Sequence, residues 1–294
     1  MRPRSLITHY HARRDDIGDL VTRRPLPGPG IDQLDPFLFL NHHGPQNYPP
    51  HNDGLPFGPH PHRGFETVTF ILEGDLAHLD TGGHESVIKA GGVQWMTAGS
   101  GLIHAEISPD TFKREGGPLE MLQLWINLPR RLKMTPPRYT GLQRDALPTV
   151  RTSDGGADVT VISGVFQHGD TRISGPIASL TGVQALVMSL KAGATLTVPA
   201  PKDKQVFLYT VSGQVDVAGA TLPEHHLARI DNDGDALLLH ATEAPTRLLC
   251  CLADPIGEPV VSHGPFVMNT REEIHQAIRD YQAGLFGHGL EHLG

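Results

Sequence analysis

The chain has 294 residues, with 38% hydrophobic residues, 33 glycines, 25 prolines and a formal net charge of −8. The length allows a substantial core and about two domains, and the glycine and proline content favours short strands joined by tight turns. The acidic balance, without any basic run, argues against direct binding of nucleic acid or of an anionic membrane, because both need a basic face.

The N-terminal stretch MRPRSLITHYHARRDD lacks the apolar segment of a secretory signal, and no later stretch is apolar enough to span a bilayer. The two cysteines, Cys250 and Cys251, are adjacent, so on a strand they would point to opposite faces. We therefore expect two buried, reduced thiols and a cytoplasmic protein.

In chain order, the first 57 residues are predicted to be loop-rich around one apolar run at residues 37–40. From residue 60 to 128, β-branched and aromatic runs alternate with glycine turns, as in ETVTFILEG, VQWMTAG, GLIHAEI and LEMLQLWINLP. Strands at this spacing predict a barrel or sandwich. Trp95 and Met96, which are neighbours on one such strand, should be one core residue and one pocket residue.

A basic, proline-rich stretch at residues 128–148 is expected to connect two domains, residues 1–135 and 136–294. The second half again shows strand-like runs, among them QALVMSLKAGATLTVPA and RLLCCLA. Near the end, Thr270 and Glu273 fit a capping box that begins a helix. Its apolar stripe at helical spacing, which we expect to pack into a core, consists of Ile274, Ala277, Ile278, Tyr281 and Leu285. Gly284 or Gly287 is the expected end of this helix.

The two halves look like copies of one unit. Aligning ILEGDL with TVSGQV places Gly74 on Gly213. His60 and His62 then fall on Pro199 and Pro201, and Glu66 falls on Gln205. The alignment predicts a duplicated all-β domain in which only the first copy carries metal-capable residues.

Two pairs of such residues stand at i and i+2 of strand-like segments. His60 and His62 lie in HPHRGFETVTFILEG, and His104 and Glu106 lie in GLIHAEI. Residues i and i+2 of a strand project to one face, and Pro61 favours an extended backbone between the first two. If the strands face one another, three imidazoles and one carboxylate meet inside a barrel. One pair would be weak evidence, but two together predict a metal site.

Most other histidines of such a chain are expected to be ordinary surface or hydrogen-bonded residues. Those expected to be of this kind include His42, His43, His51, His225 and His226.

Four blocks of the sequence resemble the signature of the pirin family, two-domain members of the cupin superfamily. These blocks are HPHRGFETVTFILEG, GGVQWMTAGSGLIHAE, LQLWINLP and EPVVSHGPFVMNT, and the resemblance is densest from residue 58 to 128. It implies two cupin-type β-barrels (a bicupin), of which the first binds a non-haem iron and the second binds no metal.

Carried onto this chain, the resemblance implies that the metal ligands are His60, His62, His104 and Glu106. The general cupin pattern takes a glutamate near Glu66 instead, so Glu66 is expected beside the site and not on the metal. Two departures from the family pattern, Ser100 in TAGSGLIH and the histidine pair in LNHHGP, bear on the choice of substrate or partner and leave the ligand set intact.

Imidazole and carboxylate ligands suit Fe(II), with Mn, Co, Ni, Cu or Zn as other divalent candidates. Octahedral coordination would leave two open positions, and Glu106 could act as a general base toward a substrate hydroxyl. The resemblance implies a quercetin 2,3-dioxygenase type of reaction, in which O₂ opens the central ring of a flavonol.

The first alternative is an iron-dependent redox sensor that binds a transcription factor or a metabolic enzyme. A second alternative, a cupin isomerase or a metal-free sugar-binding cupin, is disfavoured because all four ligands are present.

Overall fold

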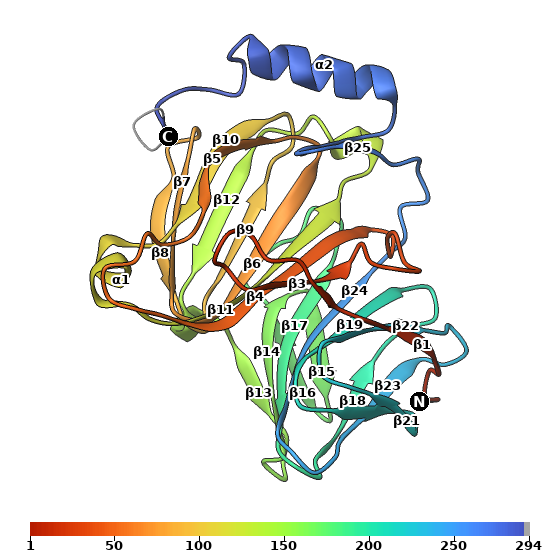
Figure 1. The fold of residues 1–294 in the computed structure, drawn as a ribbon. Coiled ribbons are helices and arrows are strands. Elements are labelled where there is room, and N and C mark those ends of the chain that lie inside the picture. The colour runs from red at the N-terminus through yellow and green to blue at the C-terminus, as the bar shows by residue number, and fades with distance from the viewer. Residues whose placement is uncertain (291–294) are drawn as a thin grey trace. The chain divides into compact units, whose positions relative to one another are not determined.

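The computed structural model describes residues 1–290 and divides into two compact units that are mostly β (Figure 1). Unit 1 comprises Met1–Arg13, Arg24–Pro36 and Asp145–Pro255. Unit 2 comprises Arg14–Arg23, Phe37–Arg144 and the chain from Ile256 onward. The expected all-β architecture with two barrel-type domains and a short C-terminal helix is confirmed.

Two antiparallel sheets form unit 2. The larger sheet has the order β12 (Arg138–Leu142), β9 (Val93–Thr97), β6 (Phe65–Glu73), β11 (Gly117–Asn127), β4 (Phe37–Tyr48), β3 (Thr22–Leu26) and β2 (Arg13–Arg14). The smaller sheet has the order β5 (Phe57–His62), β10 (Leu102–Ile107), β7 (Asp75–Asp80) and β8 (Glu85–Lys89). The remaining elements are the short helix α1 (Asp110–Glu115), the hairpin β25 (Val261–His263) and β26 (Phe266–Met268), and helix α2 (Arg271–Gln282).

Unit 1 has the same plan. Its larger sheet runs β1 (Leu6–His11), β22 (His226–Ile230), β19 (Gln205–Ser212), β24 (Thr246–Ala253), β17 (Gln184–Leu190), β14 (Ala157–Ser163) and β13 (Thr149–Arg151). Its smaller sheet runs β18 (Thr195–Pro199), β23 (Ala236–Ala241), β20 (Val215–Val217) and β21 (Ala220–Leu222). A separate hairpin pairs β15 (Val165–His168) with β16 (Thr171–Ser174).

The strand orders confirm the predicted duplication. The order β5-β10-β7-β8 in unit 2 recurs as β18-β23-β20-β21 in unit 1, and β9-β6-β11-β4 recurs as β22-β19-β24-β17. Apolar side chains of the smaller sheet fill the interior of unit 1, among them Val198, Leu237 and Leu239. Both cysteines lie on β24 as free, buried thiols, as expected.

One expectation about irregular segments is wrong, and a second is incomplete. The first 57 residues contain strands, including the twelve-residue β4, which pairs with β11 along nearly its whole length. Residues 128–148 are not only a connection, since β12 within them pairs with β9 at the edge of the larger sheet. In both cases the partner strand is distant in the sequence, so local composition carries no sign of the pairing.

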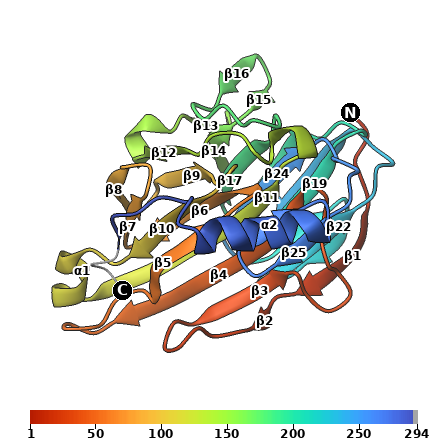
Figure 2. The same ribbon diagram turned by 90° about the horizontal axis from the view of Figure 1, so that it is seen from above.

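Helix α2 begins as predicted, because Thr270 and Glu273 form both hydrogen bonds of the capping box. Figures 1 and 2 show it beyond one end of the strands of unit 2, next to β25. Of the predicted stripe, Ile274 and Ala277 are buried, but Leu285 lies past the end of the helix and is 69% exposed. Tyr281 is also exposed, so the prediction is wrong for two of the five stripe residues.

Two smaller points complete the fold. Trp95 and Met96 are both buried, so burial does not distinguish a core residue from a pocket residue between them. Within the described part of the chain, no helix has the length and apolarity needed to cross a membrane.

Candidate metal centre

Three of the four predicted ligands come together on two neighbouring strands of unit 2. His60 and His62 end β5, and His104 lies on β10, the antiparallel neighbour of β5. The register places His104 directly opposite His60, so their side chains share one face of the sheet. His62 joins them because it follows His60 by two residues.

The three imidazoles form a compact group. Ring centroids are 4.8 Å apart for His60 and His62, 4.4 Å for His60 and His104, and 4.9 Å for His62 and His104. One potential ligand nitrogen from each ring lies within 4.8 Å of the others. His62 and His104 are buried, whereas His60 is partly exposed.

The hydrogen bonds of these rings leave nitrogens available to a ligand. His60 Nδ1 donates to the carbonyl of Gly58 at 2.7 Å, so its Nε2 carries the lone pair. Both ring nitrogens of His104 are buried without any hydrogen-bond partner. A buried polar atom without a partner is costly unless something else satisfies it.

Burial also keeps two of these rings neutral, which is the form that binds metals. It lowers the pKa of His62 to about 3, with the neighbouring His60 acting in the same direction. It lowers the pKa of His104 well below the usual histidine value, and His60, His62 and His78 add to this effect. The donor set and the unpartnered nitrogens of His104 therefore fit a divalent transition metal ion.

Glu106 lies on β10, as His104 does, but is not part of the three-histidine group. Its carboxylate is buried and accepts hydrogen bonds on both oxygens. Oε1 accepts from Thr69 Oγ1 at 2.9 Å and from the Gln94 amide, and Oε2 accepts from the Gln123 amide. These three donors fix the carboxylate beside the histidines, and the sequence pattern gave no indication of them.

Glu66 is buried on β6, where Oε1 accepts from Thr97 Oγ1 at 2.7 Å and Oε2 has no partner. Burial raises the pKa of this carboxyl, although the hydrogen bond from Thr97 opposes the shift. Glu66 is likewise outside the three-histidine group.

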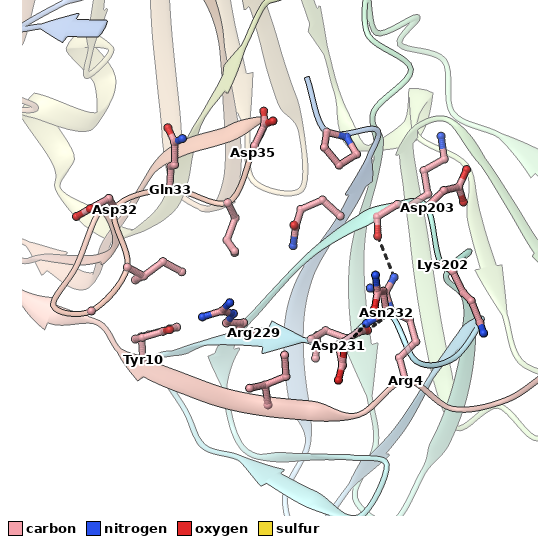
Figure 3. A pocket seen from close by; sticks show the side chains of 18 residues that line it. Arg4, Tyr10, Asp32, Gln33, Asp35, Lys202, Asp203, Arg229, Asp231 and Asn232 are labelled. Atoms are coloured by element: carbon pink, nitrogen blue, oxygen red, sulfur yellow. Dashed lines mark hydrogen bonds between the residues drawn. The ribbon is translucent and has the colours of Figure 1, made fainter. Parts of the chain in front are cut away.

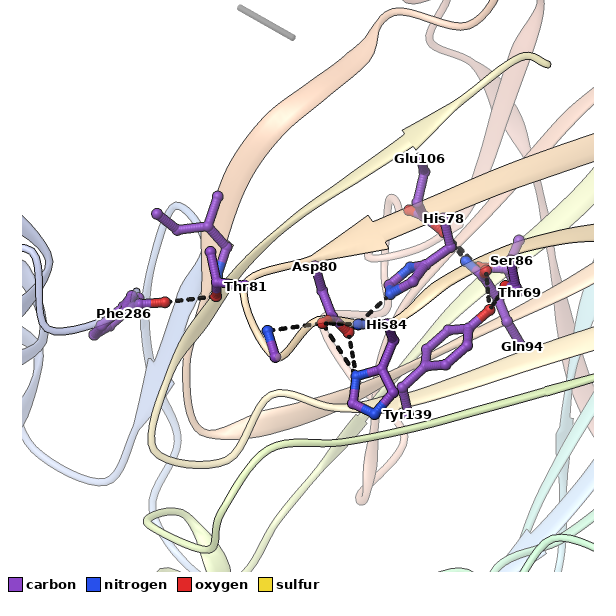
Figure 4. Close-up of polar contacts among 12 residues, drawn as sticks. Thr69, His78, Asp80, Thr81, His84, Ser86, Gln94, Glu106, Tyr139 and Phe286 are labelled. Atoms are coloured by element: carbon purple, nitrogen blue, oxygen red, sulfur yellow. Dashed lines mark hydrogen bonds and ion pairs between the residues drawn. The ribbon is translucent and has the colours of Figure 1, made fainter. Parts of the chain in front are cut away.

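A second polar network borders the site and was not foreseen (Figure 4). His78 on β7 lies opposite Glu106 in the strand register, and its ring centroid is 5.5 Å from that of His104. His78 Nε2 is 3.0 Å from Asp80 Oδ2, and its ring stacks on Tyr139 at 4.0 Å. The i and i+2 spacing in AHLD resembles that of the ligand pairs, so spacing could have singled out His78.

Asp80 joins this network to the surface. Its carboxylate accepts from the backbone of Gly82 at 2.8 Å and lies 3.1 Å from His84 Nδ1 (Figure 4). Burial acts to raise the pKa of Asp80, but the hydrogen bonds from His78 and His84 outweigh it and leave that pKa lowered.

A row of three aromatic rings lies next to His62. The Trp125 ring centroid is 5.3 Å from that of His62, 4.4 Å from Phe65 and 4.7 Å from Phe39. Trp125 and Phe39 are only half-buried, so part of this aromatic wall faces open space. We call Phe39, Phe65 and Trp125 the aromatic wall.

Helix α2 and the chain after it are held next to the metal-capable residues. Arg63, which follows His62, donates to Ser100 O and to Asp280 Oδ2, each at 2.7 Å. Its guanidinium lies 4.6 Å from the centre of the Phe286 ring, and Phe286 O accepts from Thr81 Oγ1 at 2.6 Å (Figure 4). These contacts brace the turn that holds His62.

The histidines expected to be ordinary include two that are deeply buried. His42 Nε2 lies 3.0 Å from Glu120 Oε1, and His43 Nδ1 lies 2.8 Å from Thr22 Oγ1. Both sit on β4 in hydrogen-bonded positions, which is one of the two environments expected for them.

Unit 1 contains a separate cavity of about 800 Å³ lined by charged and polar side chains of both signs (Figure 3). The buried Arg4 on its wall donates to the backbone carbonyls of Pro201, Lys204 and Asp231. None of the candidate ligands lines this cavity, so it is distinct from the metal centre.

Comparisons with known proteins show which family this chain is similar to. The family described as Pirin matches residues 19–126, and the Pirin C-terminal cupin domain matches residues 185–287. A Pseudomonas aeruginosa protein provisionally named quercetin 2,3-dioxygenase is 40% identical over 253 residues, covering 86% of this chain and 87% of its own. Pirin of Mus musculus is 39% identical over 268 residues and covers 88% of this chain and 86% of its own.

A crystal structure of quercetin 2,3-dioxygenase from Acinetobacter baumannii has a TM-score of 0.89 to this chain at 33% identity. The match covers 97% of this chain and 99% of the Acinetobacter chain. The likeness in fold therefore extends over both units.

Proposed function

The chain belongs to the pirin family, and on that premise we propose that it is an Fe(II)-dependent dioxygenase that cleaves flavonols such as quercetin. His60, His62 and His104 hold the metal, and Glu106 acts as fourth ligand or as general base. The observation that carries the proposal is the trio of close imidazoles, in which both nitrogens of the buried His104 lack a partner.

The bound metal supplies a Lewis acid and a one-electron redox centre for the reaction of the substrate with O₂. The protein supplies the proton acceptor. Glu106 is buried beside the histidines, and Thr69 holds one of its oxygens at 2.9 Å. Gln94 and Gln123 fix the same carboxylate by their amides, so it is oriented before a substrate hydroxyl arrives.

The aromatic wall supports an aromatic substrate. A flavonol is flat, and an offset stack of aromatic rings is worth about 0.5–1.5 kcal/mol beyond the area that it buries. Trp125 stands next to His62 and is only half-buried, so part of its ring is accessible within reach of the metal ligands. The buried Phe65 behind it helps to exclude water from the reacting atoms.

The test is aerobic incubation of the iron-loaded protein with quercetin, with oxygen uptake and carbon monoxide release measured together. We expect both in the wild type, and neither in His104→Ala, which should also lose its iron. Glu66→Gln is the matched control, because it alters a buried carboxyl of the same unit outside the histidine group.

Iron-loaded wild-type protein that consumes no oxygen and releases no carbon monoxide would refute the enzymatic proposal. The regulatory alternative predicts that outcome together with a protein partner retained differently by ferrous and ferric protein. A pull-down with both oxidation states therefore separates the two functions.

A further inference from the structure

A second cluster of histidines lies on unit 1, far along the chain from the ligands above. His9 and His11 stand at i and i+2 of β1, and His226 begins the antiparallel neighbour β22. The register places His226 directly opposite His11. All three side chains therefore share one face of the sheet. We call His9, His11 and His226 the surface trio.

This arrangement repeats the topology of the metal centre. There, too, two histidines at i and i+2 of one strand meet a third on the antiparallel neighbour, directly opposite one of the pair. Ring centroids of the surface trio are 4.8 Å apart for His9 and His226 and 4.9 Å apart for His11 and His226. These two separations fall within the 4.4–4.9 Å range of the metal centre. Only in the metal centre, among the described residues, do three ligand nitrogens already lie within 4.8 Å of one another.

The central histidine of the surface trio also has a fixed tautomer. His226 Nδ1 lies 2.7 Å from the carbonyl of Glu224, and a carbonyl only accepts, so this nitrogen carries the hydrogen. Its Nε2 therefore presents a lone pair. His60 has the same contact, from Nδ1 to the carbonyl two residues earlier, also at 2.7 Å. Such a hydrogen bond to the far nitrogen is typical of histidines that bind metals.

We propose that His9, His11 and His226 form a second binding site for a divalent transition metal ion, of the class Ni(II), Cu(II) or Zn(II). Three imidazoles without a carboxylate or thiolate favour these ions over Mg²⁺ and Ca²⁺. The proposal is independent of the dioxygenase proposal, because it involves the other unit and no catalytic step.

Exposure sets the properties of this site. His9 and His11 are exposed and His226 is partly exposed, so the two β1 rings can turn about their side-chain bonds to converge on one ion. Burial and the neighbouring His226 lower the pKa of His9, which favours the neutral ring. The ion would complete its coordination with water and exchange with solution more readily than an ion at the buried centre.

The test is metal stoichiometry in untagged, full-length protein. The protein is dialysed against a rising series of Ni(II) concentrations, and bound nickel per chain is measured by elemental analysis. The surface variant is His9→Gln with His11→Gln, and the buried-site variant is His62→Ala. The matched control is His240→Gln, because His240 is an exposed strand histidine of the same unit.

We expect two nickel ions per chain in the wild type and in the His240 control, and one in each of the other variants. Far-ultraviolet circular dichroism establishes that the variants are folded, and the two surface substitutions remove no core contact. A wild type that saturates at one ion overturns the proposal, and so does a folded His9/His11 double variant that still binds two.

As a second readout, Cu(II) electron paramagnetic resonance of the His62→Ala protein should show nitrogen couplings that vanish when His9 and His11 are also replaced. Couplings that persist after that replacement would assign the copper to other residues and would likewise overturn the site.

Discussion

Replacing Gly64 by alanine should test how the turn after His62 positions the metal centre. Gly64 has φ +90°, a left-handed conformation that L-residues rarely adopt. A Cβ built at this position would lie 1.9 Å from the backbone oxygen of Val267 on β26. Gly83 is a matched control, because its φ is +85° and a Cβ there meets nothing within 4 Å.

Both substitutions carry the energetic cost of a left-handed backbone at alanine, and Gly64→Ala carries two further costs. Left-handed backbone costs an alanine about 1–2 kcal/mol at either position. At Gly64 the clash adds about 1–3 kcal/mol, as overpacking usually does. It also pushes apart two carbonyls that Lys133 Nζ binds, Gly64 O at 2.9 Å and Val267 O at 3.0 Å. Losing one such bond to a charged donor adds about 1.5–3 kcal/mol. We expect a loss of roughly 5 kcal/mol for Gly64→Ala and roughly 1–2 kcal/mol for Gly83→Ala.

Tryptophan fluorescence during guanidinium unfolding measures this difference in the right unit. The chain has two tryptophans, Trp95 and Trp125, and both lie in unit 2 with Gly64 and Gly83. Because the turn carries His62, bound nickel should also fall in Gly64→Ala and stay normal in Gly83→Ala. Equal shifts of the unfolding midpoint in the two variants would show that the contact with Val267 does not limit this turn.

Four further predictions concern single side chains. Glu106→Gln should retain metal but lose most flavonol turnover, because the amide keeps an oxygen ligand and loses the base. Elemental analysis and oxygen uptake on one sample measure metal content and turnover. Full activity would exclude the base role of Glu106. Glu66→Gln should change turnover less than Glu106→Gln in the same assay. Trp125→Leu should raise KM for quercetin by about 2–10-fold, which is the equivalent of one aromatic stacking contact. The metal content should change little. An unchanged KM would show that the aromatic wall does not contribute to substrate binding. Burial lowers the pKa of Lys133 from its usual 10.5 to about 8. Between these two pH values the unfolded chain therefore binds more protons than the folded chain. The free energy of unfolding should rise with pH across this range by up to about 3 kcal/mol. Fluorescence-monitored unfolding at pH 7.5 and pH 10 should show this rise in the wild type and not in Lys133→Met; an equal pH dependence in both proteins would assign it to other groups.

The sequence predicts those parts of the fold that rest on neighbours along the chain. The glycine-bounded strands from β6 to β10 and the capping box at Thr270 are local patterns, and they appear as expected. Strand β4 was missed because its asparagine, histidines and Gly44 interrupt the apolar run, while β11 supplies its hydrogen bonds from far along the chain. For the same reason, nothing in local composition indicates that Met1–Arg13 belongs with the second half of the chain.

The same distinction holds at the metal centre. Spacing within β5 and within β10 predicts two pairs of side chains, but the pairing of the two strands decides which atoms meet. His104 meets His60 because the register places them opposite one another. Glu106 lies past an irregularity in that register, and donors from three other strands hold it. The carboxylate is therefore positioned by side-chain donors from other strands, while the histidines are positioned by the register of β5 and β10. The surface trio on β1 and β22 extends this argument, because an unremarkable HYH becomes a candidate ligand pair only when the register brings His226 opposite His11.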